Sequence, residues 1–308
     1  EVGYPVLLKA SAGGGGKGMR NVESPGDLEA SYLAAQREAK SAFGDDTVYI
    51  ERRIVSPRHI EIQILSDTHG DAIHLLEREC SIQRRHQKII EEAPSLAVSD
   101  NLRQRMGEAA VDVAKAVNYV GAGTVEFLLS GDEFFFLEMN TRLQVEHPVT
   151  ELVTGVDLVQ EQLRIASGLP LTMTQEEIFP RGWAIEARIY SEDAANGFLP
   201  STGPLAIFRP PEGPGIRFDT GVREGDIASI DFDPMLAKLI VHAPDRERAI
   251  VRMARALEEF IILGVTTNVE FLRDVIIHSQ FSEGSTTTDF IELNWPNGWD
   301  SDADVEAA

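Results

Sequence analysis

The sequence predicts an α+β fold, in which strands and helices alternate in the first half and short strands dominate the second. Three observations lead to this class. Apolar runs of strand length alternate with longer amphipathic patterns in the first half. Residues 167–182 form a break rich in glycine and proline. Beyond it, short strand-like segments are separated by further prolines and glycines.

The first expected elements are a strand, a glycine-rich loop and a helix. Residues 4–10 form a short apolar run, which is typical of a buried strand. The run SAGGGGKG follows at once. Ser24 has the residue type of a helix N-cap, Pro25 suits the first helical position, and an alanine-rich stretch leads to Gly44. We therefore expect a helix over residues 24–44.

Two strands come next, over residues 48–55 and 58–65. In the second, isoleucines at 60, 62 and 64 alternate with His59, Glu61 and Gln63. Because successive side chains of a strand point to opposite faces, this alternation predicts one core face and one polar face.

A second helix and a hairpin complete the first half. Apolar residues recur at helical spacing over residues 99–117, and Ser99 suits the N-cap. Residues 124–129 and 134–139 are strand-like and flank a Ser-Gly-Asp turn. In the second half, we expect one amphipathic helix over about 246–260 within a mainly β unit.

The composition disfavours several classes of protein. The 308 residues carry a formal charge of −22, which opposes non-specific binding to nucleic acid or anionic lipid. No apolar run approaches the ~20 residues of a membrane span. The single cysteine, Cys80, rules out an internal disulfide framework and is typical of a reducing compartment. We expect a cytoplasmic protein with a disordered acidic tail over residues 296–308.

Two glutamates and an asparagine on the expected hairpin indicate a metal site. If the loop has an odd number of residues centred on Asp132, Glu126 pairs with Glu138 across the ladder, and Asn140 lies on the same face. Opposed carboxylates repel each other unless a cation lies between them, and an all-oxygen set suits Mg²⁺ or Mn²⁺. The alternative, a solvated hairpin, is disfavoured by three neighbouring phenylalanines at 134–136.

Two segments before the hairpin carry positive charge. The backbone N–H groups of SAGGGGKG, with Lys9 and Lys17, suit a phosphate, but the spacing matches no established phosphate motif and a flexible loop is equally compatible. The cluster RRHQK at 84–88 is the densest basic run. It is either an anion site or a surface segment paired with Glu91 and Glu92.

The segment over residues 140–148 follows directly after the expected metal-binding strand. In it, Arg142 can hold a planar anion through two hydrogen bonds, and Glu146 beside it can act as a base toward that anion. A simple Arg–Glu ion pair is the alternative. Arg188, on the polar side of an alternating strand, reads by itself as a surface charge.

Together these segments resemble the biotin carboxylase component of biotin-dependent carboxylases, which belongs to the ATP-grasp superfamily. The resemblance is carried by KASAGGGGKGM, SIQRRHQKIIEEAP, GAGTVEFL and EMNTRLQVEHPVTE in the first half, and by RGWAIEARIYSED, DFDPMLAKLIV and LGVTTN in the second. It covers residues 1–295. It implies an ATP-grasp domain over 1–168, whose two α+β lobes clasp ATP, and a mainly β C-terminal domain over 180–295.

The resemblance also implies a function and a role for each matching residue. The function is carboxylation of biotin by bicarbonate through carboxyphosphate at the expense of ATP, the first half-reaction of an acyl-CoA or pyruvate carboxylase. ATP would contact Lys9, Gly15, Gly16, Glu51, Arg52, Arg53, Ile54, His59, Gln83 and His86. Glu126, Glu138 and Asn140 would hold the metal; Lys88, Arg142, Gln144 and the Val145 backbone would hold bicarbonate; Glu146 would be the base; and Arg188 would stabilise the biotin enolate.

Two departures from the family pattern leave alternatives open. The family's N-terminal α/β domain is missing before residue 1, and the sequence contains no A-M-K-M biotin-attachment motif. Biotin would therefore arrive on a carrier domain or chain that works with a carboxyltransferase, and a homodimer is expected. The alternatives are a truncated, non-catalytic nucleotide-binding fragment and a ligase of the carbamoyl phosphate synthase type, which needs no arginine facing biotin.

Overall fold

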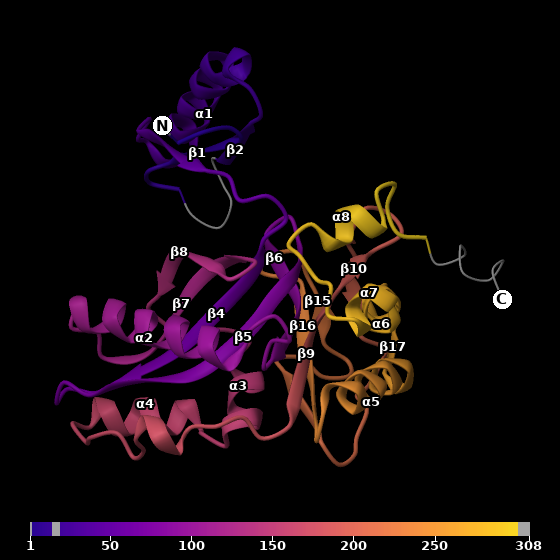
Figure 1. Cartoon of the computed structure of the whole chain (residues 1–308). Helices are drawn as coiled ribbons and strands as arrows, with labels where there is room; N and C mark the ends of the chain where they lie inside the picture. Colours follow the sequence, from indigo (N-terminus) through magenta and orange to yellow (C-terminus); the bar gives the residue numbers. More distant parts are fainter. Residues whose placement is uncertain (1, 14–18, 301–308) are drawn as a thin grey trace. The chain divides into compact units, whose positions relative to one another are not determined.

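The computed structural model describes residues 2–13 and 19–300, which form two compact units. Residues 1–57 and 85–87 make up the first, here called the N-terminal unit. Residues 58–84 and 88–308 make up the second, the main unit. Figure 1 follows the chain through both. The division falls near residue 57, whereas the sequence predicts a boundary between residues 168 and 180.

The N-terminal unit is a small antiparallel sheet with one helix packed on it. Its strands are β1 (Val6–Ala10), β2 (Met19–Val22) and β3 (Val48–Arg52), in the order β2-β1-β3. Helix α1 (Leu28–Phe43) follows the short 3₁₀ turn η1 (Pro25–Asp27). The helix expected over residues 24–44 therefore starts with the 3₁₀ turn, and its α-helical part begins at Leu28. The Ser24 hydroxyl donates to the Asp27 carboxylate. Gly44 ends α1 with a positive φ of 76°, which glycine adopts without strain.

The main unit is built on an eight-stranded sheet with the order β14-β16-β9-β6-β5-β4-β7-β8. These strands are β4 (Arg58–Ser66), β5 (Ala72–Arg84), β6 (Gln87–Ala93), β7 (Gly121–Ser130), β8 (Glu133–Asn140), β9 (Trp183–Tyr190), β14 (Ile216–Thr220) and β16 (Met235–Ala243). The long strand β5 and its neighbour β6 are absent from the sequence prediction. The basic cluster at 84–88 lies where β5 ends and β6 begins.

Short strands and helices complete the main unit. The short strands are β10 (Glu192–Asp193), β11 (Leu199–Pro200), β12 (Gly203–Pro204), β13 (Ile207–Arg209), β15 (Ile227–Ala228) and β17 (Ile261–Leu263). The helices are α2 (Asp100–Ala116), α3 (His147–Thr154), α4 (Leu158–Ala166), the 3₁₀ turn η2 (Gln175–Glu177), α5 (Arg246–Glu259), α6 (Val269–Ile277), α7 (Ser279–Ser282) and α8 (Phe290–Asn294). The second half is rich in strands, as expected, and it contains α6, α7 and α8 in addition to the one helix expected from the sequence.

The large sheet joins the two halves of the sequence. Strand β6 pairs with β9 in antiparallel register, with Glu91 opposite Glu186 and Ile90 opposite Ala187. Strand β9 in turn pairs with β16. Residues from both sides of the predicted boundary therefore contribute to one continuous sheet, and the glycine- and proline-rich segment 167–182 connects them.

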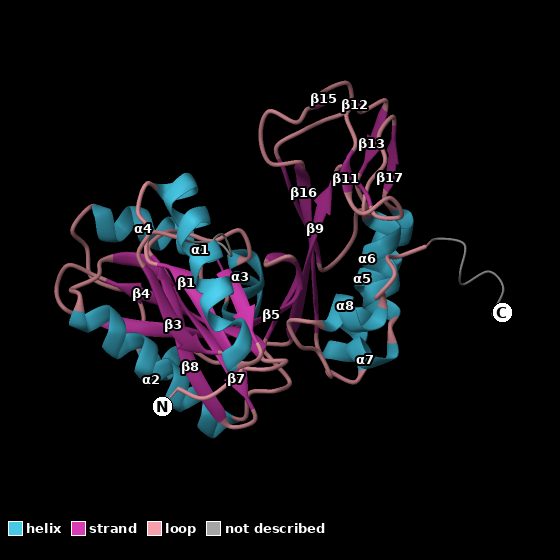
Figure 2. Ribbon diagram, turned by 90° about the horizontal axis from the view of Figure 1, so that it is seen from above, coloured by secondary structure: helices cyan, strands magenta, loops and turns pink. Residues whose placement is uncertain are grey.

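Helices cover both faces of the sheet. Helix α2 packs its apolar stripe on Ile60, Ile62 and Ile64 of β4, as expected from the helical spacing, and Ser99 caps it by accepting from the Leu102 N–H. Helix α4 packs on the opposite face near Leu65. Helices α5 and α6 form a second core with β9 and β16, and Figure 2 shows them beside these strands.

The polar face of β4 is buried as well. His59 keeps 7% of its surface exposed, and Glu61 and Gln63 keep none. The alternation of side chains is as expected, and α3 with the segment before it covers the polar face, so that this face lies inside the protein. Buried polar groups need partners, so this face forms a hydrogen-bonded interior.

The hairpin of β7 and β8 places Glu126 opposite Glu138, as expected, through a different geometry. Ser130 pairs with Glu133, so only Gly131 and Asp132 form the turn. The register then shifts by one residue between Glu126 and Phe127. This bulge, and not an odd-numbered loop, brings the two glutamates face to face.

The described part of the acidic tail contains a buried tryptophan. Trp299 packs in the same cluster as Phe271 and donates from its indole N–H to Asp274 at 2.7 Å. The predicted disorder is therefore wrong for Trp299, because indole burial and this hydrogen bond hold it in place. Residues 301–308 lie outside the described part of the chain.

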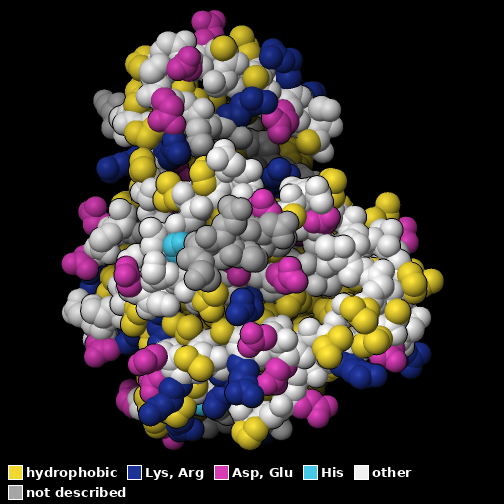
Figure 3. Space-filling view, turned by 90° about the vertical axis from the view of Figure 1, so that its right-hand side faces the viewer, with side chains coloured by type: hydrophobic (Ala, Val, Ile, Leu, Met, Phe, Trp, Pro, Cys, Tyr) yellow, Lys and Arg dark blue, Asp and Glu magenta, His cyan; other side chains and the backbone are white. Residues whose placement is uncertain are grey.

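Charged side chains of both signs are interspersed on the face drawn in Figure 3, beside hydrophobic ones. Among the described residues, no helix is both long enough and apolar enough to cross a membrane.

Gly107 of α2 tests how closely this helix packs on β5. A Cβ at this position would lie 2.4 Å from the His74 ring. Gly107→Ala should lower the free energy of unfolding by about 1–2 kcal/mol, because overpacking outweighs the ~1 kcal/mol gain in helix propensity. Denaturant unfolding measures this. Gln104→Ala, on the exposed face of the same helix, should change stability by less than ~0.5 kcal/mol. A Gly107→Ala protein as stable as wild type would contradict the tight contact.

Candidate active site

A fully buried arginine, Arg78, organises the interior of the main unit. It lies on β5 with no exposed surface. Its guanidinium donates to Glu61 and Gln63 of β4, Thr124 of β7, Thr150 of α3 and Gln144 in the preceding segment. These hydrogen bonds tie three strands to α3. Burial alone would lower the pKa of Arg78, but Glu61 and Glu146 reverse this and raise it.

Lys88 lies among three carboxylates, one of which, Glu61, also pairs with Arg78. Its Nζ is 2.5 Å from Glu61, 2.8 Å from Glu126 and 2.7 Å from Glu146. Burial disfavours the charged amine, yet these carboxylates outweigh it and raise the pKa of Lys88 well above its ordinary value. Lys88 is therefore a fixed positive charge. This geometry favours an anion site over the surface alternative, because Glu91 and Glu92 pair with Arg188 and Arg246 instead.

Glu146 is ionised in this environment. Burial and the nearby Glu61 raise its pKa, but Lys88, Arg188 and Arg78 outweigh them and hold the pKa below its ordinary value. It keeps only 2% of its surface exposed. Its Oε1 accepts from Lys88, and its Oε2 accepts from Arg188 at 3.0 Å. A buried ionised carboxylate held between two cations can accept a proton from a bound substrate.

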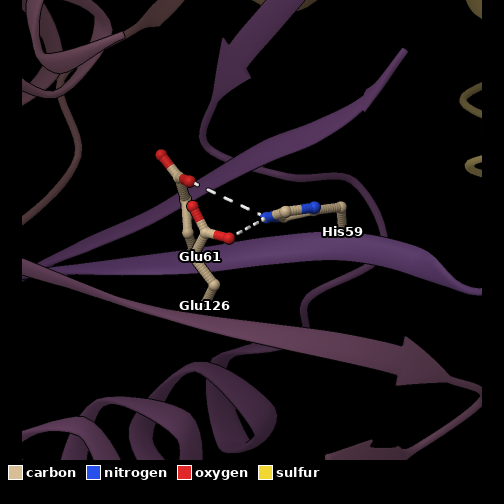
Figure 4. Close-up of side chains that lie close together, drawn as sticks. All are labelled: His59, Glu61 and Glu126. Atoms are coloured by element: carbon tan, nitrogen blue, oxygen red, sulfur yellow. Dashed lines mark ion pairs between the residues drawn. The ribbon is translucent and has the colours of Figure 1, made fainter. Parts of the chain in front are cut away.

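His59 and Gln83 lie beside Glu126. Figure 4 shows the His59 ring directed at the carboxylates of Glu61 and Glu126, and Nε2 is 3.1 Å from Glu126. The Gln83 amide nitrogen lies 3.0 Å from His59 Nδ1 and also donates to the Cys80 carbonyl. Because an amide nitrogen only donates, Nδ1 accepts and Nε2 carries the ring hydrogen. Burial would raise the pKa of Glu126, but His59 and Lys88 outweigh it and lower the pKa strongly.

The three predicted metal ligands share one face of the hairpin. Glu126 lies directly opposite Glu138, and Asn140 donates from its amide to Glu126 Oε1 at 3.0 Å. Glu126 is buried, whereas Glu138 is exposed. The donor set is entirely oxygen, since the Asn140 amide oxygen is also available by rotation, and such a set suits a hard divalent cation. These residues therefore fit Mg²⁺ or Mn²⁺. Their role as ligands stays a prediction.

The predicted bicarbonate residues follow on the segment between β8 and α3. Gln144 accepts from Arg78 and donates to Glu126, so both ends of its amide are fixed. The Val145 carbonyl accepts from Lys238 of β16. Arg142 is exposed, and its guanidinium reaches the Leu143 carbonyl and Asn140. It does not pair with Glu146, so the simple Arg–Glu ion pair considered from the sequence is wrong.

Arg188 is buried and belongs to this cluster, contrary to its reading as a surface charge. It keeps 8% of its surface exposed. Its Nε donates to Glu91 at 2.6 Å, and its Nη2 donates to Glu146 at 3.0 Å. The pairing of β9 with β6 brings it here.

The remaining predicted ATP contacts lie mostly in the N-terminal unit. Lys9 of β1 forms an ion pair with Glu51 of β3 at 3.0 Å. Arg52 is exposed, Arg53 pairs with Glu23, and Ile54 is partly buried. Gly15 and Gly16 lie outside the described residues. His86 is exposed and has a positive φ of 67°. Contacts of these residues with ATP stay predictions.

Sequence reasoning missed several residues that hold the cluster together. These are Glu61, Gln63, Arg78, Thr150, Glu91, Glu186 and Lys238. The one available signal was the alternation along β4, which sets His59, Glu61 and Gln63 on one face. This signal predicts a polar face but not its burial, because burial depends on which elements cover the face.

Family models match nearly the whole chain. Residues 1–174 match the model of the carbamoyl-phosphate synthase L chain, ATP binding domain, and residues 186–293 match the biotin carboxylase C-terminal domain. Together with the mixed fold, the first match places the chain in the ATP-grasp class of ATP-binding folds. With the second match, the chain belongs to the biotin carboxylase family. The family and fold class expected from the sequence are confirmed.

Relatives agree with this assignment. Methylcrotonoyl-CoA carboxylase subunit alpha, mitochondrial, of Rattus norvegicus is 53% identical over 94% of this chain and 41% of the relative. Propionyl-CoA carboxylase alpha chain, mitochondrial, of Caenorhabditis elegans is 51% identical over 97% of this chain and 42% of the relative. The chain therefore spans about two fifths of the length of these relatives.

Two solved structures show the same fold. The biotin carboxylase domain of the Hydrogenobacter thermophilus 2-oxoglutarate carboxylase, a dimer in complex with MgADP, ADP and bicarbonate, has a TM-score of 0.92 at 46% identity. A biotin carboxylase complex with β,γ-ATP from Campylobacter jejuni has a TM-score of 0.91 at 44% identity. The matches cover 96% and 95% of this chain, and 65% of each of those chains.

Removing the buried arginine tests its organising role. Arg78→Met should lower the free energy of unfolding by about 3–5 kcal/mol, because Glu61 and Gln144 lose their shared buried donor. Denaturant unfolding measures the change. Arg248→Met is the matched control, since its ion pair with Asp245 is exposed and should contribute less than ~1 kcal/mol. Equal losses in the two variants would contradict the role of Arg78.

Proposed function

We propose that this chain uses ATP to carboxylate biotin with bicarbonate, as the first half-reaction of a biotin-dependent carboxylase. The observation that carries the proposal is Glu146, a buried ionised carboxylate held between Lys88 and Arg188. A carboxylate base between two fixed cations suits a reaction in which bicarbonate loses its proton and negative charge then develops on biotin. The solved complexes that contain MgADP, ATP analogue or bicarbonate support it.

In the first step, bicarbonate would bind among Lys88, Arg142, Gln144 and the Val145 backbone. Glu146 would remove its proton, and the resulting oxygen would attack the γ-phosphorus of ATP, so that ADP leaves and carboxyphosphate forms. Lys88 would neutralise charge on the transferring group, because its amine lies 2.7 Å from the proposed base Glu146 and 2.8 Å from the proposed metal ligand Glu126. Gln144 cannot rotate freely, since Arg78 and Glu126 fix both ends of its amide.

The nucleotide and its metal would bind to the residues that match the family's motifs. In the N-terminal unit, these are Lys9, Gly15, Gly16, Glu51, Arg52, Arg53, Ile54 and His86. In the main unit, they are His59 and Gln83. Glu126, Glu138 and Asn140 would hold a divalent cation, which when bound neutralises phosphate charge during transfer.

In the second step, carboxyphosphate would break down to carbon dioxide and phosphate. The phosphate would take the ureido proton of biotin, and the Arg188 guanidinium would stabilise negative charge on the ureido oxygen as the nitrogen attacks carbon dioxide. Biotin is the substrate of this chain and would arrive on a carrier domain or chain. A carboxyltransferase partner and a homodimer complete the proposal, and the dimer has a precedent in the Hydrogenobacter thermophilus structure.

Glu146→Gln tests the base. Bicarbonate-dependent ATP cleavage should fall by about 10²–10⁴-fold, because the amide cannot accept the proton, while ATP affinity stays close to wild type. Phosphate release and equilibrium ATP binding measure the two effects. Glu151→Gln is the control, since Glu151 lies in the next turn and pairs with Arg217. A parallel loss of ATP affinity would contradict the proposed role.

Arg188→Ala separates the proposed function from the alternatives. Added biotin should stimulate bicarbonate-dependent ATP cleavage in the wild type, and this stimulation should vanish in the variant. A chain that cleaves ATP with bicarbonate but never responds to biotin would fit a ligase of the carbamoyl phosphate synthase type. ATP binding without cleavage would identify a non-catalytic nucleotide-binding chain.

A further inference from the structure

Arg188 donates a hydrogen bond to a buried carboxylate, that of Glu91, which has no role in the proposed reaction. Glu91 of β6 has no exposed surface, and its Oε1 accepts from Arg188 Nε at 2.6 Å. Arg188 Nη2 reaches Glu146 on the other side. Among the described residues, Arg188 Nη1 has no hydrogen-bond partner on the protein, so it is the donor available to a substrate. Glu91 therefore sets the direction in which that donor points.

A second buried carboxyl lies beside Glu91. Glu186 of β9 is directly opposite Glu91 in the sheet and also has no exposed surface. Neither oxygen of Glu186 has a hydrogen-bond partner among the described residues, and Oε2 of Glu91 has none either. Directly opposed residues have Cβ atoms about 4.5–5.5 Å apart. Two ionised carboxylates on directly opposed residues, both out of water, repel each other strongly, so one of them holds a proton.

The cations nearby decide which carboxyl stays ionised. Glu91 has the short hydrogen bond from Arg188, whereas the nearest amine to Glu186, that of Lys238, is 3.9 Å away and donates to the Val145 carbonyl. The proton therefore belongs on Glu186. The charged groups that act on this pair are Lys88 from β6, Arg188 from β9, Lys238 from β16 and Glu146 just before α3. Asp219 of β14 lies 3.6 Å from Lys238, and burial together with Lys238 lowers the pKa of His147 in α3.

The titration behaviour of the pair agrees with this assignment. Burial raises the pKa of Glu91 to about 7, although Arg188 opposes the shift. Burial and the neighbouring Glu91 raise the pKa of Glu186 well above its ordinary value. Both carboxyls therefore favour the protonated form more than an exposed glutamate does, and the hydrogen bond from Arg188 places the negative charge on Glu91.

We propose that Glu91 is a positioning residue for Arg188, and that Glu186 holds a proton which allows Glu91 to remain a carboxylate behind it. This inference rests on the proposed function, in which Arg188 stabilises charge on biotin. A neutral Glu186 can also donate its O–H to the unpaired Oε2 of Glu91, which would satisfy both buried groups. Protonation of Glu91 would release Arg188 Nε and misalign Nη1.

The kinetic test compares Glu91→Gln with Glu92→Gln in the full chain. Glu92 is the next residue of the same strand, but it pairs with Arg246 and Trp183. Glu91→Gln should lower the kcat for biotin carboxylation on the order of 100-fold, while bicarbonate-dependent ATP cleavage without biotin falls far less. The acid limb of the biotin-dependent pH profile, expected near the Glu91 pKa of about 7, should disappear. Glu92→Gln should lower Tm and leave the ratio of the two activities unchanged.

Outcomes of this comparison separate the inference from the proposed function. An unchanged activity ratio and an unchanged acid limb in Glu91→Gln would overturn the positioning role while leaving the proposed function intact. A wild-type chain that binds ATP but shows no bicarbonate-dependent cleavage would instead overturn the proposed function, and with it the role of Glu91 in catalysis.

The proton on Glu186 has a test that needs no activity. The infrared difference spectrum between wild type and Glu186→Gln at neutral pH should show the carbonyl band of one protonated carboxyl, which shifts in D₂O. A carboxyl with a raised folded pKa stabilises the folded state fully below its unfolded pKa of ~4.3, and this contribution is lost as pH rises toward the folded pKa. The Tm of wild type should therefore fall more steeply above about pH 5 than that of Glu186→Gln. A carboxylate band in place of the carbonyl band, with equal Tm slopes, would overturn the assignment.

Discussion

The buried guanidinium of Arg78 is the interaction on which the rest of the site depends. A charged group without exposed surface is tolerated only when hydrogen bonds and opposite charge replace its hydration. Arg78 finds these on β4, β7, α3 and the segment before α3. Because all of these partners must be present together, the arginine fixes how the segment that carries Gln144 and Glu146 lies on the sheet.

Ion pairs connect Arg78 to the other charged residues of the cluster. Glu61 accepts from both Arg78 and Lys88, and Lys88 then holds Glu126 and Glu146. Glu146 accepts in turn from Arg188, whose other side is held by Glu91. Because neighbouring cations oppose the desolvation of these buried carboxylates, the pKa values of Glu61, Glu126 and Glu146 lie below the ordinary value. For Glu91, burial outweighs Arg188 and the pKa is raised. The same logic explains why Glu186, which lacks a close cation, is the carboxyl that retains a proton.

The continuous sheet makes this network possible. Arg188 and Lys238 come from the second half of the sequence, and they reach the cluster because β9 pairs with β6 and β16 pairs with β9. The large sheet therefore contains strands from both of the domains predicted from the sequence. It brings side chains from one predicted domain into the candidate site of the other, so that the residue proposed to stabilise biotin contacts the residue proposed as the base.

The sequence by itself determined the local elements and most of the candidate site residues. Periodicity located β1, β4, α2 and α5, and the motifs around Lys88, Arg142 and Glu146 indicated an anion site and a family. It could not show that the polar face of β4 is buried, that a bulge sets Glu126 opposite Glu138, or that Arg188 lies inside. Each of these depends on pairing between strands far apart in the chain, which local periodicity does not encode. Burial and charge pairing therefore came only from the tertiary structure, because desolvation depends on which elements cover a residue.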